Sequence, residues 1–91
     1  MAELKETLTI VNRLGLHARA AAALAKVAER FTSDITVHKD GQRARASSVI
    51  ELLLLCGQPG TDIEVRASGD DARQALDAIA ALVADRFGEA D

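Results

Sequence analysis

The 91-residue sequence has 48% hydrophobic residues, 2% aromatic residues and a formal net charge of −3 at pH 7. This length supports one hydrophobic core, so we expect a single domain over residues 1–91, and the apolar fraction argues against a disordered chain. The acidic balance excludes the basic footprint of a nucleic-acid-binding protein. One cysteine, Cys56, excludes an internal disulfide and fits a reducing compartment. We see no signal peptide and no apolar run long enough to enter a bilayer, and we expect a soluble cytoplasmic protein.

The first third of the chain predicts a strand, a loop and a helix. In residues 4–11, leucine and isoleucine alternate with threonine, which is typical of a half-buried strand. The segment "NRLG" predicts a loop, in which Gly15 allows a backbone angle that other residues resist. From Ala18 to about Phe31 the apolar residues recur at helical spacing, which predicts an amphipathic helix.

The segment "DITVHKDGQRARA" predicts a β-hairpin. Ile35 and Val37 alternate with polar residues, and residues 43–46 form the returning strand. Asp40 and Gly41 fit a type I′ turn, which needs two residues that tolerate positive φ.

A short helix over residues 49–55 should follow the hairpin. Ser48 and Glu51 have the three-residue spacing of a capping box, in which each side chain bonds the other residue's backbone N–H. Ser47 could provide the cap instead after a one-residue shift. Gly57 is placed to end the helix.

The last third predicts a strand over residues 62–68 and a helix over residues 70–87, with Asp70 and Asp71 at the favourable N-terminal end of that helix. The order is therefore βαββαβα, and each apolar face is one-sided. We expect an α+β open-faced sandwich, in which a four-stranded antiparallel sheet carries three helices on one face.

His17 and Arg19 are the most informative pair for function. The N–H groups of Ala18, Arg19 and Ala20 have no partner within the helix, and the helix dipole is positive there. This environment welcomes an anion and should keep His17 neutral and nucleophilic. The guanidinium of Arg19 suits phosphate oxygens. The group could therefore accept and release a phosphoryl group, although a lone His-X-Arg also fits an ordinary helix start.

The helix over residues 49–55 has apolar residues around nearly its whole circumference. A helix that covers one face of a sheet can bury only one stripe, so some of these residues should face solvent and mark a partner surface. The alternative is a helix that is buried on both sides.

Metal binding is a weak alternative. His38 and Cys56 are the other possible ligands, and they lack paired spacing. We expect His38 to be an exposed strand residue and Cys56 to be a small buried or half-buried hydrophobe.

The segment "GLHARAAA" resembles the active-site signature of the HPr family of histidine phosphocarriers, usually Gly-[Leu/Ile/Met]-His-Ala-Arg-Pro-Ala. "ASSVIELLLLCGQPGTDIEV" is similar to the second signature of that family, and the similarity extends over essentially the whole chain. The helix after Ser48 and the "FGEAD" ending look closer to the nitrogen-related branch, NPr, than to the carbohydrate branch.

The resemblance implies a cytoplasmic, monomeric phosphohistidine carrier in sugar uptake or nitrogen-related regulation, rather than a stand-alone enzyme, and implies no cofactor. By this resemblance His17 would accept the phosphoryl group, through Nδ1, from enzyme I charged by phosphoenolpyruvate and pass it to EIIA-type proteins. Arg19 would steady the phosphate, together with the backbone of Ala18 and Arg19. Ser48 would match the serine that a dedicated kinase modifies in some lineages. The partner-binding surface would comprise Val49, Ile50 and Leu53.

Two residues depart from the family pattern. Ala20 stands where the family usually has proline, which removes a fixed backbone angle from the helix start. Ser47 stands where sugar-transport members commonly have lysine, which bears on recognition by a serine kinase. A second hypothesis is a regulatory docking module that acts through the apolar surface of residues 49–53, with His17 phosphorylation as a switch.

Overall fold

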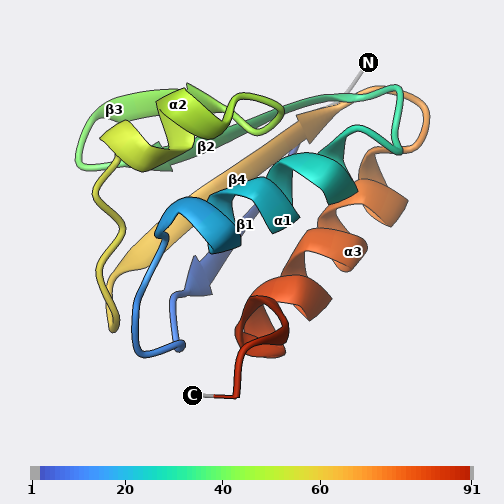
Figure 1. Ribbon diagram of the computed structural model, residues 1–91. Coiled ribbons are helices and arrows are strands. Elements are labelled where there is room, and N and C mark those ends of the chain that lie inside the picture. The colour runs from blue at the N-terminus through green and yellow to red at the C-terminus, as the bar shows by residue number, and fades with distance from the viewer. Residues whose placement is uncertain (1–2, 91) are drawn as a thin grey trace.

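The computed structural model describes residues 3–90 and confirms the predicted order of elements (Figure 1). The elements are β1 (Glu3–Thr9), α1 (Ala18–Ala28), β2 (Asp34–Lys39), β3 (Gln42–Arg45), α2 (Val49–Leu54), β4 (Asp62–Ser68), α3 (Ala72–Ala84) and a 3₁₀ turn, η1 (Arg86–Gly88).

The four strands form one antiparallel sheet in the order β1-β4-β2-β3. Figure 1 shows α1, α2 and α3 together on one face of this sheet, as predicted. The strand alternation explains this arrangement, because Val37 of β2 lies between Val65 of β4 and Ala44 of β3. All three side chains are buried, so one face of the sheet is apolar and needs the helices as a cover.

The core between the sheet and the helices is almost entirely aliphatic. Its largest fully buried apolar side chains are Ile10, Leu24, Leu52, Ile63, Leu76, Ile79, Val37 and Val65. The aromatic residue Phe87 is also buried, and Phe31 packs against the core from its edge. Leucine, isoleucine and alanine therefore supply the packing that aromatic rings provide in many other small domains.

The hairpin and both long helices refine the sequence predictions. Asp40 and Gly41 have φ values of 51° and 79°, as a type I′ turn requires. Helix α1 ends at Ala28, earlier than expected, because the next residues form tighter bonds such as Phe31 N–H to the carbonyl of Ala28 at 3.2 Å. Helix α3 begins at Ala72 and ends at Ala84, within the predicted range.

The predicted roles of Gly57 and Cys56 are wrong. Cys56, not Gly57, adopts the left-handed conformation after α2, with φ of 53°, and this places its side chain in solvent. Gly57 is required for packing instead. A Cβ atom at Gly57 would lie 2.7 Å from Cδ1 of Ile10 and 3.1 Å from Cβ of Leu16.

Candidate functional site

His17 is the N-cap residue of α1, as the sequence predicts. Its backbone is extended (φ −82°, ψ −177°), and its carbonyl accepts the first helical bond from Ala21 N–H at 2.8 Å. The N–H groups of residues 18–20 therefore lie ahead of the hydrogen-bonded helix. The His17 side chain makes no capping bond and is 27% exposed. A partly exposed imidazole thus lies beside backbone donors that can bind an anion.

The loop before His17 is fixed against the segment that follows α2. Leu16 N–H donates to the carbonyl of Gly57 at 2.7 Å, and Leu16 itself is buried. Gly15 has φ of +68°, and a Cβ atom there would collide with the same carbonyl. The predicted need for glycine is confirmed, and close approach of two backbones adds a second reason for it.

Glu89 contacts His17 directly, which the sequence analysis did not anticipate. Its Oε2 is paired with Nε2 of His17, and its side chain is only 10% exposed. The amide nitrogen of Asn12 donates to Oε1 of Glu89 at 2.9 Å and to the carbonyl of Gly15 at 2.8 Å. Because both partners of this nitrogen are acceptors, the orientation of the Asn12 amide follows from its neighbours. The loop, the helix start and the C-terminal segment therefore meet at His17.

These contacts favour the ionised form of Glu89. Hydrogen bonds from Asn12 and then from His17 hold the pKa of Glu89 below its ordinary value, against the opposing effect of partial burial. The positive charge of nearby Arg19 acts in the same direction. A carboxylate only accepts hydrogen bonds, so Nε2 of His17 must donate, and the lone pair of the neutral ring lies on Nδ1. Within residues 3–90, Nδ1 has no hydrogen-bond partner.

Arg19 lies at the same site, although its guanidinium is exposed. A small pocket of about 120 Å³ is lined by Arg13, Leu14, Arg19, Glu89 and Ala90. Arg13 is a second cation that the sequence analysis did not single out. This pocket therefore brings two arginines to the carboxylate that pairs with His17.

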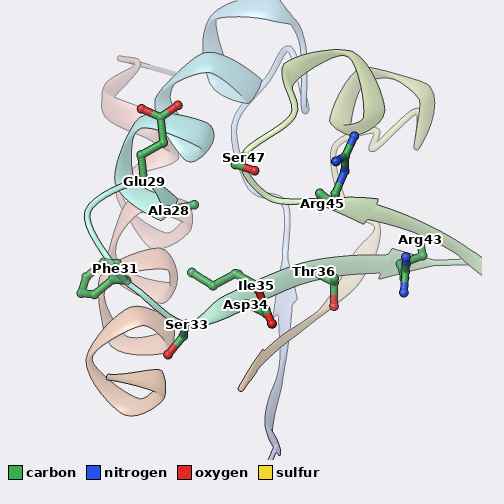
Figure 2. Close-up of a pocket in the computed structure, with 10 residues that line it drawn as sticks. All are labelled: Ala28, Glu29, Phe31, Ser33, Asp34, Ile35, Thr36, Arg43, Arg45 and Ser47. Atoms are coloured by element: carbon green, nitrogen blue, oxygen red, sulfur yellow. The ribbon is translucent and has the colours of Figure 1, made fainter. Parts of the chain in front are cut away.

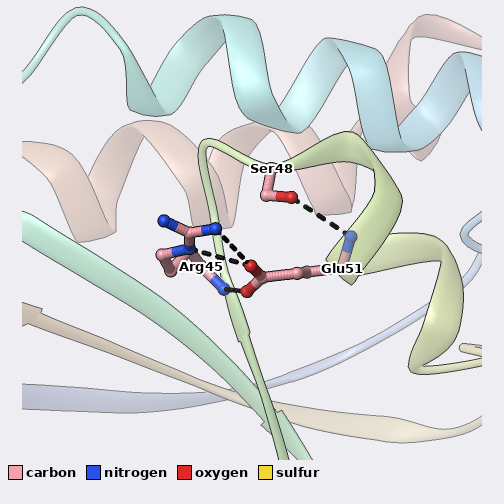
Figure 3. Close-up of polar contacts among 3 residues, drawn as sticks. All are labelled: Arg45, Ser48 and Glu51. Carbon is pink, nitrogen blue, oxygen red and sulfur yellow. Dashed lines mark hydrogen bonds and ion pairs between the residues drawn. The ribbon is translucent and has the colours of Figure 1, made fainter.

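Ser48 is the N-cap of α2, and Ser47 is not. Its Oγ accepts from the backbone N–H of Glu51 at 3.2 Å (Figure 3). The reciprocal half of the predicted capping box is wrong, because the Glu51 carboxylate turns to Arg45 at the end of β3. It accepts from the Arg45 backbone N–H at 2.9 Å and from Nε and Nη2 at 2.9 and 2.5 Å. This pairing lowers the pKa of Glu51 and raises that of Arg45.

The apolar residues of α2 divide between core and surface, as predicted. Leu52 and Leu55 are buried, whereas Ile50 is 72% exposed and Leu54 is 69% exposed. Val49 and Leu53 lie between these extremes, with Leu53 37% exposed. The alternative of a helix buried on both sides is therefore wrong.

Two other features lie apart from His17. A cavity of about 420 Å³ lies between the end of α1 and the β2–β3 hairpin, and its lining includes Glu29, Asp34, Arg43 and Arg45 (Figure 2). His38 is half-buried on β2, not exposed as expected, and bonds Thr36 Oγ1 at 2.8 Å. Partial burial, followed by the charge of Arg66, lowers the pKa of His38.

Residues 3–90 contain no group of three or more histidine, cysteine or acidic side chains that could bind a metal ion. None of the helices in this part of the chain is long and apolar enough to cross a membrane.

Known proteins share both the sequence and the fold. Residues 4–85 match the family described as PTS HPr component phosphorylation site. Phosphocarrier protein NPr of Shewanella violacea is 47% identical over 90 residues, covering 99% of each chain. Phosphocarrier protein HPr of Cupriavidus necator is 38% identical over 88 residues, covering 97% of this chain and 99% of that one. The crystal structure of HPr-C-His from Thermoanaerobacter tengcongensis superposes with a TM-score of 0.89 at 37% identity over 98% of both chains. The chain therefore belongs to the HPr family of phosphocarrier proteins of the phosphotransferase system, the family to which both HPr and NPr belong.

Proposed function

We propose that His17 accepts a phosphoryl group from phosphoenolpyruvate-charged enzyme I and passes it to an EIIA-type protein, as a monomer in the cytoplasm. The observation that carries this proposal is the arrangement of His17. Its ring offers a lone pair on Nδ1, beside a helix start with unpaired N–H groups and beside Arg19. The nucleophile, the backbone donors for an anion and the cation of Arg19 thus all lie at the start of α1.

Phosphoryl transfer to His17 would require few further protein groups. The lone pair of Nδ1 forms a bond to phosphorus, the bond between phosphorus and the donor atom of enzyme I breaks, and its electron pair stays on the donor. Catalysis of this kind is mostly positioning and charge stabilisation. The backbone N–H groups of Ala18 and Arg19 and the positive end of α1 would bind the phosphoryl oxygens. The guanidinium of Arg19 would contribute a planar pair of donors.

The direct test is phosphorylation of the purified protein by enzyme I and phosphoenolpyruvate, followed by intact-mass spectrometry. We expect one acid-labile phosphate on the wild-type protein and on His38→Ala, and none on His17→Ala. The His38→Ala variant is the control, because it removes the other imidazole of the chain and leaves His17 in place. Phosphate on His17→Ala would overturn the proposal. Transfer onward to a carbohydrate or a nitrogen-related EIIA protein then identifies the branch.

The partner surface is proposed to comprise Val49, Ile50 and Leu53 on α2. It is supported by the exposure of apolar side chains there, since such a patch commonly marks an interface. A docking module that uses His17 phosphorylation only as a switch is the second function that this surface favours. A docking module should keep its partner after His17→Ala and lose it after Leu53→Glu. A carrier should lose phosphoryl transfer after His17→Ala even when it still binds the partner.

Ser48 is proposed as a regulatory phosphorylation site for a serine kinase and a phosphorylase. A phosphate at this N-cap would meet the positive end of α2 and could compete with Glu51 for Arg45. Incubation with a serine kinase of this system and ATP should label the wild-type protein and Ser47→Ala but not Ser48→Ala. Labelling of Ser48→Ala would exclude this site.

A further inference from the structure

We propose that Glu89 is a positioning residue for phosphoryl transfer, because its carboxylate holds the proton on Nε2 of His17 and so presents Nδ1 as the nucleophile. This inference rests on the proposed function of His17. It assigns a role to a residue that lies outside the family match over residues 4–85.

Glu89 is held in place from two sides. Its backbone N–H donates to the carbonyl of Arg86 at 2.9 Å, and Phe87 anchors the same turn in the core at 5% exposure. Its carboxylate accepts from Asn12, which is wholly buried. Since Asn12 also donates to Gly15 in the loop before His17, the carboxylate has a defined position relative to the imidazole.

The hydrogen-bond chemistry then selects one form of the ring. Oε2 of Glu89 is paired with Nε2, and a carboxylate cannot donate. The neutral imidazole must therefore carry its proton on Nε2 and keep the Nδ1 lone pair available. In many enzymes a carboxylate fixes the tautomer of a neighbouring histidine in the same way.

The same carboxylate would stabilise the product. When Nδ1 forms its bond to phosphorus, the proton on Nε2 stays with the ring, and the ring becomes positively charged. The negative charge of Glu89 then faces the Nε2 side of the ring. The phosphoryl oxygens on Nδ1 face the cations and N–H groups described above. Opposite charges are thus paired on both sides of the imidazole.

Three variants test the role of Glu89. Glu89→Ala removes the acceptor, and Glu89→Gln removes the charge and offers an oxygen to only one of the two donors, Asn12 or His17. Glu29→Gln is the matched control, because the Glu29 side chain is exposed just after the far end of α1 and makes no hydrogen bond within residues 3–90. Thermal melts establish that each variant is folded.

The first readout is the ¹⁵N spectrum of the His17 ring in the unphosphorylated protein. We expect the Nε2–H tautomer in the wild-type protein and in Glu29→Gln, and a mixture of tautomers in Glu89→Ala. The second readout is the rate of phosphoryl transfer from charged enzyme I. We expect Glu89→Ala to lower this rate by about tenfold or more, in line with the loss of other orienting partners of histidine, and Glu89→Gln to lower it less.

The role of Glu89 is refuted by a wild-type ring protonated on Nδ1, or by a folded Glu89→Ala protein with wild-type tautomer and rate. Measuring His17→Ala in parallel separates this failure from failure of the proposed function. Phosphate on His17→Ala would reject His17 as acceptor, whereas an inert His17→Ala with an unaffected Glu89→Ala would reject only Glu89.

Discussion

At the scale of single residues, the two ring nitrogens of His17 have different surroundings. Nε2 faces the carboxylate of Glu89, whereas Nδ1 has no partner within residues 3–90. If His17 accepts the phosphoryl group as proposed, this asymmetry would direct the attack through Nδ1. The Arg19 side chain adds positive charge near Glu89 and makes no hydrogen bond or ion pair in the described part of the chain.

Because Arg19 is exposed and unpaired in residues 3–90, its replacement should affect transfer but not folding. We predict that Arg19→Ala slows phosphoryl transfer from enzyme I by about tenfold, somewhat less than the loss of a buried preorganised donor. Arg19→Lys should recover part of the rate, since lysine keeps the charge but loses the planar fork. Rapid-quench kinetics measures both. Arg30→Ala, in the exposed turn after α1, is the control, and an equal effect of Arg30→Ala would contradict a specific role.

His17 and Arg19 could be proposed from the sequence because both residues belong to one local pattern at a helix start. Glu89 was missed because it lies 72 residues from His17, and no spacing rule connects the two. The sequence predicted Asn12 only as part of a loop, whereas its buried amide connects Gly15 of that loop to Glu89 of the C-terminal segment. Contacts of this kind depend on how the C-terminal segment folds back, which local periodicity does not encode.

At the scale of elements, the start of α1 determines whether Ala20 can replace the usual proline. Ala20 is wholly buried and is the third residue of the helix, where its N–H has no partner within the helix. The missing proline therefore removes rigidity but no hydrogen bond. The backbone before His17 is instead restrained by the contact of Leu16 with Gly57.

We predict that Ala20→Pro is tolerated. Its free energy of unfolding should change by less than about 1 kcal/mol, because proline fits the first turn of a helix. Ala25→Pro, in the middle of the same helix, should lose roughly 3 kcal/mol or more, since it removes a hydrogen bond of the helix. Urea denaturation monitored by circular dichroism measures both. Equal losses in the two variants would show that α1 does not begin at Ala18.

The N-cap of α2 leads to a second prediction, about the stability of variants at Ser48. Ser48→Ala should lower the free energy of unfolding by about 1 kcal/mol, because Glu51 N–H loses its acceptor. Ser47→Ala should change it by less than about 0.5 kcal/mol, as is usual at exposed positions. Chemical denaturation of the two variants provides the comparison. A larger loss in Ser47→Ala would contradict the observed cap.

The predictions of helices, strands and turns were confirmed where a single sequence pattern determined the structure. They were wrong where a contact with another element also acted on the same residue. The Asp-Gly turn and the apolar periodicities located the hairpin and the helices correctly. The capping-box spacing identified Ser48 but not the partner of Glu51, because Arg45 of the adjacent strand provides a stronger, charged donor. Gly57 suggested a helix end, whereas contact with Ile10 is what excludes a side chain there.

At the scale of the whole molecule, Asp71 connects the loop after α1 to the start of α3. Its carboxylate accepts from the backbone N–H and hydroxyl of both Thr32 and Ser33, at 2.5–3.3 Å. The hydrogen bond from the Ser33 hydroxyl is the main cause of its lowered pKa. The sequence predicted this aspartate only as a favourable charge for α3, because its partners belong to another segment.

This link predicts a specific pH dependence. The lowered pKa of Asp71 means that its stabilising contribution is present above the unfolded pKa of about 4 and is lost as pH falls through the lower folded value. Asp71→Asn should therefore melt below wild type at neutral pH, and the difference should shrink below about pH 4. His38, Glu51, Glu64 and Glu89 remain in both proteins, so their shared titration cancels in this difference.

Asp70→Asn is the control, because Asp70 is exposed and makes no hydrogen bond within residues 3–90. Its melting temperature should follow the wild type at every pH, as measured by calorimetry. A pH-independent deficit in Asp71→Asn would contradict a contribution from the charged carboxylate.

The central claim is that His17 carries the phosphoryl group on Nδ1. The most direct measurement is a ¹H–¹⁵N correlation spectrum of the ¹⁵N-labelled protein after phosphorylation by enzyme I, with ³¹P coupling observed on the ring nitrogens. We predict a single phosphorus–nitrogen coupling, on Nδ1 of His17, while Nε2 keeps its proton. Coupling on Nε2, or on the ring of His38, would contradict the claim.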